Sequence, residues 1–295
     1  IIQWHHFAYM VIGLALLGYG MSGTVVSIMQ HALMRNFKAV YISSIVLFGI
    51  TSIFTFLLAQ QIPFNSEELL WDRQQLWFLA GLFVLLSIPF FFAATAICLA
   101  FMQFKKQTAK IYAADLVGAS LGSAGIIVLL YWLFPQHALV TIGIVSVLSA
   151  SAAVIELHVG KRKAAVTVIV LIAAGLLIVG QYVELNMSPY KSLQQIMRIS
   201  GADIKHQRSG PMGLLTVVEN KSVPFRHAPG LSLNAVDEPP PQMALFIDGD
   251  AMSVINQFSG SVTQLTFLDY MPSALPYHLD QPGSALIVGG GGGSS

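Results

Sequence analysis

Charged residues are scarce in this sequence. Only 10% of its 295 residues are Asp, Glu, Lys or Arg, whereas 55% are hydrophobic, and the mean hydropathy is +0.69. These values lie outside the range of soluble globular domains and predict a membrane protein. The few charges also exclude one class of partner. Residues 184–295 hold six basic and nine acidic side chains, and a mildly acidic surface argues against nucleic-acid binding.

Cysteine is almost absent as well. The single cysteine, Cys98, lies in an apolar segment, so no disulfide or thiolate metal site can form within these residues. The eight histidines are scattered, and we predict no metal site. We expect Trp4, His5 and His6 to mark a membrane interface, because a metal centre there would need further ligands. Since the first residue is Ile1 rather than Met, we take the sequence as part of a longer chain.

Long apolar runs dominate the first part of the chain. A helix needs about 20 apolar residues to cross the hydrocarbon of a bilayer, and six segments come close to that length. We expect Pro89, in the third segment, to kink the helix rather than end it, because neighbouring helices can satisfy the freed carbonyl group. The six predicted helices are residues 7–29, 40–58, 76–102, 116–134, 138–155 and 164–183.

The loops between these segments alternate in charge. Eight of the nine basic residues before residue 184 fall in the first, third and fifth loops, and the second loop is acidic. Because basic loops face the cytoplasm, we expect an integral protein of a bacterial inner membrane with the lipid bilayer as its partner. The eight basic residues are Arg35, Lys38, Lys105, Lys106, Lys110, Lys161, Arg162 and Lys163.

The composition changes near residue 184. Residues 214–219 and 243–247 have the pattern of β-strands, and residues 285–288 form a short apolar run typical of a strand buried in a parallel sheet. The predicted fold is therefore an all-α membrane bundle of about six transmembrane helices (residues 1–185). It is followed by a small β-rich subdomain on the substrate side (186–283) and by the first strand of a truncated α/β Rossmann-like domain (284–295).

A glycine loop follows the last predicted strand directly. Gly289, Gly291 and Gly293 have the G-x-G-x-G spacing that lets a backbone turn tightly and approach a cofactor. The alternative is a flexible Gly/Ser linker. A dinucleotide site would have a glycine at the sixth position, where this chain has Ser294, so a nicotinamide or flavin cofactor is disfavoured.

Three further features have a functional and a structural interpretation. Asp248, at the turn Asp248-Gly249-Asp250, either holds a polar substrate or only makes a hairpin turn. Tyr270 either lines the same cleft or packs in the core. In the fourth predicted helix, Asp115 either complements the helix dipole beside the close-packing pair Gly118 and Gly122 or lies on an ion pathway.

Taken together, these segments resemble the membrane-embedded spermidine synthase-like proteins. Residues 112–122, with Pro135 after them, resemble a tyrosine-containing, glycine-rich helix start of that family. Residues 188–190 (Ser-Pro-Tyr) and 246–249 (Phe-Ile-Asp-Gly) are similar to the small β-domain of spermidine synthases, and residues 286–293 to the donor-binding loop of class I methyltransferase folds. The chain departs from the family at Gly292, where spermidine synthases usually carry an aspartate.

The resemblance implies a membrane-anchored transferase. Its donor would be S-adenosylmethionine or decarboxylated S-adenosylmethionine, bound at Gly289, Gly291 and Gly293. The acceptor would be a small-molecule amine or a related group, bound at Asp248 and Tyr270. The family's catalytic aspartate would follow Ser295, so the catalytic residues stay unknown and residues 1–295 alone are expected to be inactive. A methyltransferase-like activity fits equally well, and homo-oligomerisation stays open.

The predicted topology conflicts with this function. Six spans with cytoplasmic basic loops place the β-rich part outside the cytoplasm, where adenosyl donors are not expected. Either one span, residues 164–183, is miscounted or this part binds another ligand. The competing class is a non-enzymatic transporter-like or scaffold membrane protein with a vestigial soluble domain.

Overall fold

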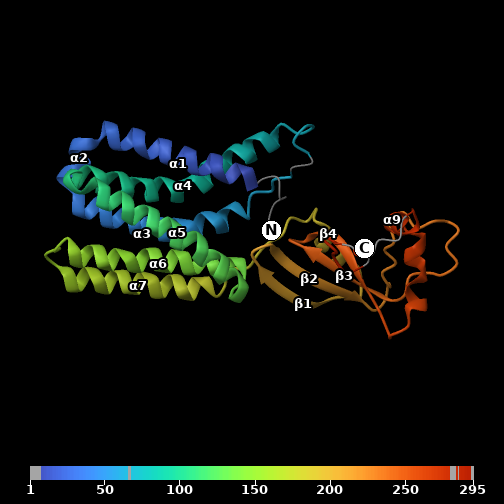
Figure 1. Ribbon diagram of the computed structural model, residues 1–295. Helices are drawn as coiled ribbons and strands as arrows, with labels where there is room; N and C mark the ends of the chain where they lie inside the picture. The colour runs from blue at the N-terminus through green and yellow to red at the C-terminus, as the bar shows by residue number, and fades with distance from the viewer. Residues whose placement is uncertain (1–7, 66–67, 280–283, 285, 294–295) are drawn as a thin grey trace. The chain divides into compact units, whose positions relative to one another are not determined.

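The computed structural model describes residues 8–65, 68–279, 284 and 286–293. The chain divides into two units, one ending at Asn186 and the other beginning at Met187. The first is helical and the second contains the strands (Figure 1). We describe each unit by itself.

Six helices of the first unit are long and apolar enough to cross a membrane. This number agrees with the sequence prediction, and Pro89 lies inside a helix that continues past it. The fourth spanning helix begins at Thr108, eight residues before the predicted start, because polar residues at its first turns are also compatible with a helix. The spanning helices are α1 (Ala8–Ile28), α3 (Phe37–Ala59), α4 (Gln74–Gln103), α5 (Thr108–Trp132), α6 (Pro135–Glu156) and α7 (Arg162–Gly180).

Glycines bring two pairs of these helices into close contact. A Cβ atom at Gly18 of α1 would lie 2.5 Å from the Cβ of Phe90 in α4. One turn further along α1, the buried hydroxyls of Ser22 and Thr95 are hydrogen-bonded at 2.9 Å. Helices α3 and α6 meet in the same manner, since a Cβ at Gly49 would lie 2.5 Å from the carbonyl oxygen of Gly143. Small residues thus allow the close backbone approach that stabilises helix pairs in lipid.

Helix α5 is the exception. No residue of α5, which the structure describes throughout, is buried, and a Cβ at Gly118 or Gly122 would meet no atom within 4 Å. The described chain therefore supplies no helix contact for the small-residue pair that the sequence analysis predicted to pack closely.

Exposed aromatic side chains mark one end of the helices. Trp71 precedes α4, Trp77 lies in its first turn, Trp132 ends α5 and Tyr182 follows α7, and each is at least 79% exposed. Because the chain crosses the bilayer between the loops, these positions share the end opposite to the basic loops. Tryptophan and tyrosine prefer the boundary between hydrocarbon and water, so this pattern agrees with a membrane-spanning unit.

The second unit contains a four-stranded antiparallel sheet in the order β1-β2-β3-β4. Strands β2 and β3 confirm the two predicted strands, and β1 and β4 were missed. Short helices lie on either side of the sheet in the sequence. The elements are α8 (Ser192–Met197), β1 (Ala202–Gly210), β2 (Gly213–Asn220), β3 (Gln242–Ile247), β4 (Asp250–Asn256), the 3-10 helices η3 (Val262–Tyr270) and η4 (Pro272–Ala274), and α9 (Leu275–Leu279).

The core of this unit lies between the sheet and α8. Alternate residues of β2 and β3 are buried, as expected for strands with one face on a core. Val218, Ala244 and Phe246 pack with Leu193 of α8. The turn between β3 and β4 consists of Asp248 and Gly249, whose φ angles are +53° and +76°. Positive φ at both positions matches the twist of a two-residue hairpin, and glycine adopts it without strain.

Candidate functional site

The β3–β4 turn is fastened to the segment that enters α8. The Nζ atom of Lys191 donates a hydrogen bond of 2.6 Å to the carbonyl oxygen of Asp248, and the backbone N–H of Leu193 donates to the carbonyl oxygen of Gly249 at 3.0 Å. The Ser192 hydroxyl donates to Oδ1 of Asp250 at 2.8 Å. Residues 188–190 and 246–249, which are far apart in the sequence, are therefore joined through the residues that adjoin them.

The carboxylate of Asp248 connects this turn to β2. Its Oδ1 accepts a hydrogen bond of 2.8 Å from the backbone N–H of Leu214, and the Asp248 N–H donates to the Leu214 carbonyl at 2.9 Å. Oδ2 makes no hydrogen bond to a described residue. The side chain thus stabilises the turn, and only this second oxygen is available for the predicted substrate role.

Lys191 is the most deeply enclosed charged residue in this unit. It is only 2% exposed. Burial lowers the pKa of its ammonium group from the ordinary value, and the nearby carboxylates of Asp250 and Asp248 oppose this shift. Because burial disfavours the charged form, the ammonium needs hydrogen-bond acceptors such as the Asp248 carbonyl. No sequence pattern predicts this role, because a lysine next to a turn is usually solvated.

The residues that the structure describes do not form the predicted Rossmann-like strand. Leu286, Ile287 and Val288 belong to no strand, and Leu286 and Val288 are 91% and 88% exposed. Ala285 lies outside the described residues. An apolar strand of this type is buried when helices cover both faces of a parallel sheet, but every described strand pairing is antiparallel.

The glycine loop itself lies against the edge strand β4. Gly289, Gly291 and Gly293 have φ angles of +77°, +52° and +85°, a conformation that favours glycine. A Cβ at Gly292 would lie 1.8 Å from the carbonyl oxygen of Val254 in β4. The loop therefore has the tight backbone that the sequence predicted, but it borders an antiparallel sheet.

The structure does not bring the two predicted substrate residues together by any described contact. Tyr270 is the last residue of η3 and is 38% exposed. Its carbonyl oxygen accepts a hydrogen bond of 3.0 Å from the N–H of Ser232, so it fastens the long β2–β3 connection to η3. Asp248 lies instead in the β3–β4 turn, directly after the last residue of β3.

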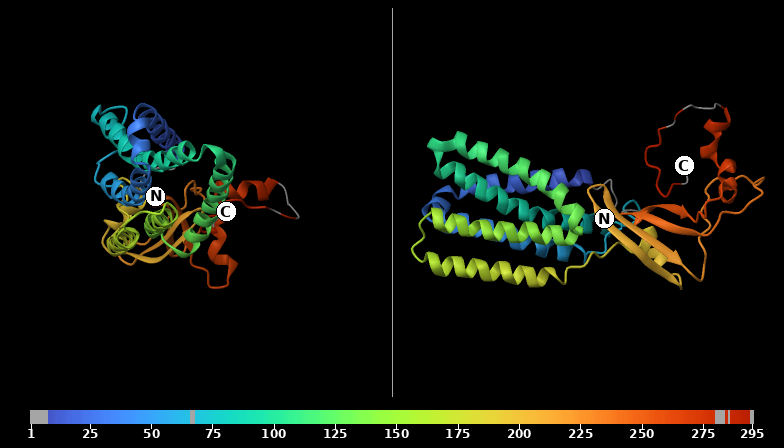
Figure 2. Two further views of the ribbon diagram at one scale, coloured as in Figure 1. Left: turned by 90° about the vertical axis from the view of Figure 1, so that its left-hand side faces the viewer. Right: turned by 60° about the horizontal axis from the view of Figure 1, so that its bottom comes forward.

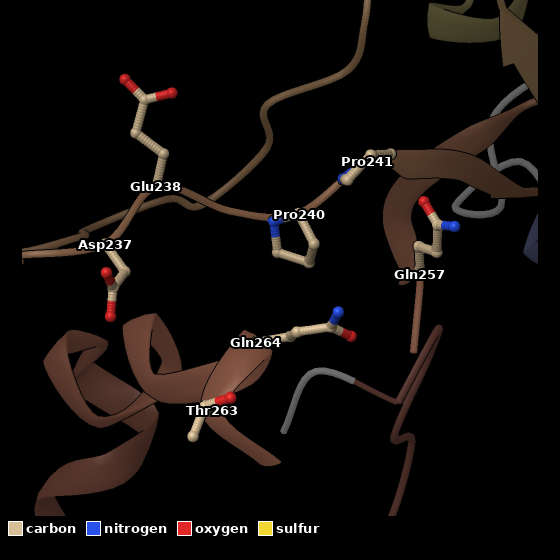
Figure 3. A pocket seen from close by; sticks show the side chains of 7 residues that line it. All are labelled: Asp237, Glu238, Pro240, Pro241, Gln257, Thr263 and Gln264. Carbon is tan, nitrogen blue, oxygen red and sulfur yellow. The ribbon is translucent and has the colours of Figure 1, made fainter. Parts of the chain in front are cut away.

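A polar pocket that the sequence analysis did not identify lies between the β2–β3 connection and η3 (Figure 3). Its volume is about 330 Å³. The Asp237 side chain points toward η3, Gln264 extends from η3 into the space below Pro240, and Glu238 points the other way (Figure 3). The lining residues are Asp237, Glu238, Pro240, Pro241, Gln257, Thr263 and Gln264.

Hydrogen bonds hold this pocket together. Oδ2 of Asp237 accepts a hydrogen bond of 2.6 Å from the Thr266 hydroxyl, and Oε1 of Gln264 accepts one of 3.1 Å from the N–H of Ser259. Glu238 is paired with Arg226. The second carboxylate oxygen of Asp237 and the amide nitrogen of Gln264 have no described partner. This combination of a carboxylate and carboxamides suits a small ligand with N–H donors.

One feature of the pocket can be recognised in the sequence. Residues 237–241 place two acidic residues directly before three prolines, and proline fixes the backbone φ near −65°. In the sequence alone, these prolines only separate the two predicted strands. Among the described residues, no group of three or more His, Cys, Asp or Glu side chains could hold a metal ion.

No protein-family model, curated protein or solved structure matches this chain.

Proposed function

We propose that this chain belongs to a membrane-anchored, spermidine synthase-like transferase that alkylates an amine from an S-adenosylmethionine-type sulfonium donor. The observation that carries the proposal is the junction around Asp248. The two segments of the β-rich unit that resemble spermidine synthases, residues 188–190 and 246–249, adjoin the hydrogen bonds Lys191–Asp248 at 2.6 Å and Leu193–Gly249 at 3.0 Å. A shared site needs such proximity, and the sequence separation does not guarantee it.

In this proposal the donor binds beside the glycine loop. The backbone N–H groups of Gly289 and Gly291 approach the donor without an intervening side chain, as in other glycine loops. The N–H of Gly293 instead donates a hydrogen bond of 2.7 Å to the Gly290 carbonyl and stabilises the turn of the loop. The described residues do not form the first strand of a Rossmann-like domain. The Rossmann-like character of this segment therefore belongs to the proposal and rests on the resemblance of the glycine loop. The donor is a substrate here, either S-adenosylmethionine or its decarboxylated form.

The polar pocket is our candidate for the acceptor amine. Asp237 neutralises an ammonium group of the acceptor, and the amide oxygen of Gln257 accepts an N–H hydrogen bond. In the reaction the lone pair of the neutral reacting amine forms a bond to the carbon next to the sulfonium. The carbon–sulfur bond breaks, its electron pair converts the sulfonium to a thioether, and the amine releases one proton to solvent. Orientation of the two reactants supplies most of the acceleration.

Donor binding and transfer can be measured separately. The full-length protein is titrated calorimetrically with S-adenosylmethionine and with its decarboxylated form, and amine products are then sought by mass spectrometry. We expect binding of one donor, and an Asp237→Asn variant that binds the donor normally but has a KM for the amine raised on the order of 10-fold. Asp203→Asn, which removes a carboxylate exposed elsewhere on the unit, serves as the matched control.

A non-enzymatic scaffold is the second candidate. The exposure of Leu286 and Val288, 91% and 88%, favours it, because a functional donor loop normally follows a buried strand. If the full-length protein binds neither donor at millimolar concentration, the transferase proposal is refuted and the scaffold function replaces it.

The orientation of the membrane unit sets a condition on the transferase. With six spans, the residues after α7 lie on the side opposite to the basic loops, which the charge rule places outside the cytoplasm. Single-cysteine variants in a Cys98→Ser background determine this orientation with a membrane-impermeant maleimide. Labelling of Leu233→Cys but not of Gly160→Cys in intact cells would require a donor supplied outside the cytoplasm. The reverse pattern would place the β-rich unit beside cytoplasmic adenosyl donors.

A further inference from the structure

The three basic loops lie together at one end of the membrane unit. Helix α2 (Gln30–Arg35), the connection between α4 and α5 and the turn between α6 and α7 all occur at the left-hand end of the helices in Figure 1, and the right-hand view of Figure 2 agrees. These connections and the adjoining helix starts carry eight Lys and Arg residues. The charge pattern of the sequence is therefore a single basic surface in three dimensions.

This basic surface lacks acidic partners. In the described part of the chain, the three ion pairs all join residues of the β-rich unit. Glu156, at the end of α6, is an acidic residue at the same end, and its carbonyl oxygen, not its carboxylate, is hydrogen-bonded to His158 at 2.7 Å. Asp115, in the second turn of α5, is a second carboxylate near this end. Two carboxylates cannot neutralise eight cations, so the surface has a strong positive potential.

The α6–α7 turn contains a depression within this surface. It has a volume of about 620 Å³ and is lined by residues 158–164. Three of these residues, Lys161, Arg162 and Lys163, are cationic and exposed, and none is acidic. The cationic lining of this open depression selects for an anion.

The position of the depression identifies the anion. Helix α7 begins at Arg162 and has 19 residues, which corresponds to about 28 Å at 1.5 Å per residue. The hydrocarbon core of a bilayer is about 30 Å thick. The three cations therefore lie at the level of the lipid phosphates. Their separation from the phosphates is then below the Debye length, which is about 10 Å at 0.1 M salt, so the attraction is not fully screened.

We propose that the α6–α7 turn binds the headgroup of an anionic phospholipid. Lys161, Arg162 and Lys163 contact the headgroup, and the other two basic loops add to the positive potential around it. This inference is independent of the transferase proposal, because it concerns only the membrane unit. It predicts a preference for acidic over zwitterionic lipid and a dependence on ionic strength.

The test uses the full chain in a neutral detergent. Retention of phosphatidylglycerol and of phosphatidylcholine is titrated by native mass spectrometry, for the wild type and for the triple variant Lys161→Gln, Arg162→Gln, Lys163→Gln. The matched control is Arg198→Gln, Arg208→Gln, Lys221→Gln, which removes the same charge from exposed positions of the β-rich unit. We expect the first triple variant to lose between about 10-fold and 100-fold in affinity for phosphatidylglycerol, and the control to lose none.

Three outcomes would overturn the proposal. The first is equal affinity of the wild type for both lipids, and the second is an equal loss of affinity in the two triple variants. The third is full displacement of phosphatidylglycerol by millimolar inorganic phosphate, which would assign the depression to a soluble phosphate compound. Unfolding temperatures of the variants without added lipid exclude a general loss of folding as the cause.

Discussion

Substitution of Lys191 tests the junction that the proposed transferase depends on. Lys191→Met keeps a long side chain in the buried position but removes the hydrogen bond of 2.6 Å to the Asp248 carbonyl. A buried acceptor that loses its donor costs about 1–3 kcal/mol. Since Lys191 is 2% exposed, water cannot replace the donor without opening the core. We therefore expect the β3–β4 hairpin to open more often than in the wild type.

Hydrogen exchange measured by mass spectrometry on the intact protein detects this opening. All four tryptophans precede residue 184, so tryptophan fluorescence would not report on the β-rich unit. A loss of 1–3 kcal/mol corresponds to exchange that is roughly 5-fold to 150-fold faster at the amides of β3 and β4. Lys221→Met, at an exposed position, is the control. Unchanged exchange in Lys191→Met would refute the view that this hydrogen bond stabilises the turn.

Three further predictions follow from the same structure. Burial lowers the pKa of Lys191, so the unfolded chain binds more protons than the folded chain between that lowered pKa and about 10.4. The stability of the β-rich unit should therefore rise with pH in this window. In Lys191→Met this rise should be absent. Gly292→Ala should displace the glycine loop and weaken donor binding at least several-fold, since its Cβ would lie 1.8 Å from a β4 carbonyl; calorimetry of Gly290→Ala, whose Cβ would have an ordinary contact of 3.5 Å, gives the control value. Gly18→Ala should lower the stability of the membrane unit by about 1–3 kcal/mol in detergent unfolding, and Gly23→Ala, with open space around it, should not; equal effects would contradict the close α1–α4 contact.

The membrane helices were predictable because each one is defined by its own residues. About 20 apolar residues in sequence must form a helix to satisfy their backbone groups in lipid, whatever the neighbouring helices are. The start of α5 was placed eight residues too late, because Thr108, Lys110 and Asp115 lower the local hydropathy without breaking a helix. Polar residues at the membrane boundary therefore make the predicted ends of a helix inaccurate, but the helix itself is still predicted.

The strands were predictable only where one face is buried. Short apolar runs identified β2 and β3, and alternate residues of both strands are buried in the structure. Strand β1 is polar along most of its length and largely exposed, and it is held at the edge of the sheet by backbone pairing with β2. A polar edge strand carries no hydrophobic alternation, so its pairing depends on a partner that the local sequence does not specify.

What the sequence by itself determined is the presence of six spanning helices, their alternating loop charges and the tight backbone of the glycine loop, because each of these depends on the chemistry of neighbouring residues. Only the tertiary structure decided that Lys191 is buried against the Asp248 turn, that the glycine loop borders β4 and that the acidic residues before the prolines line a pocket. These features arise from contacts between segments far apart in the chain, and the free energy of such contacts depends on packing that no local pattern encodes.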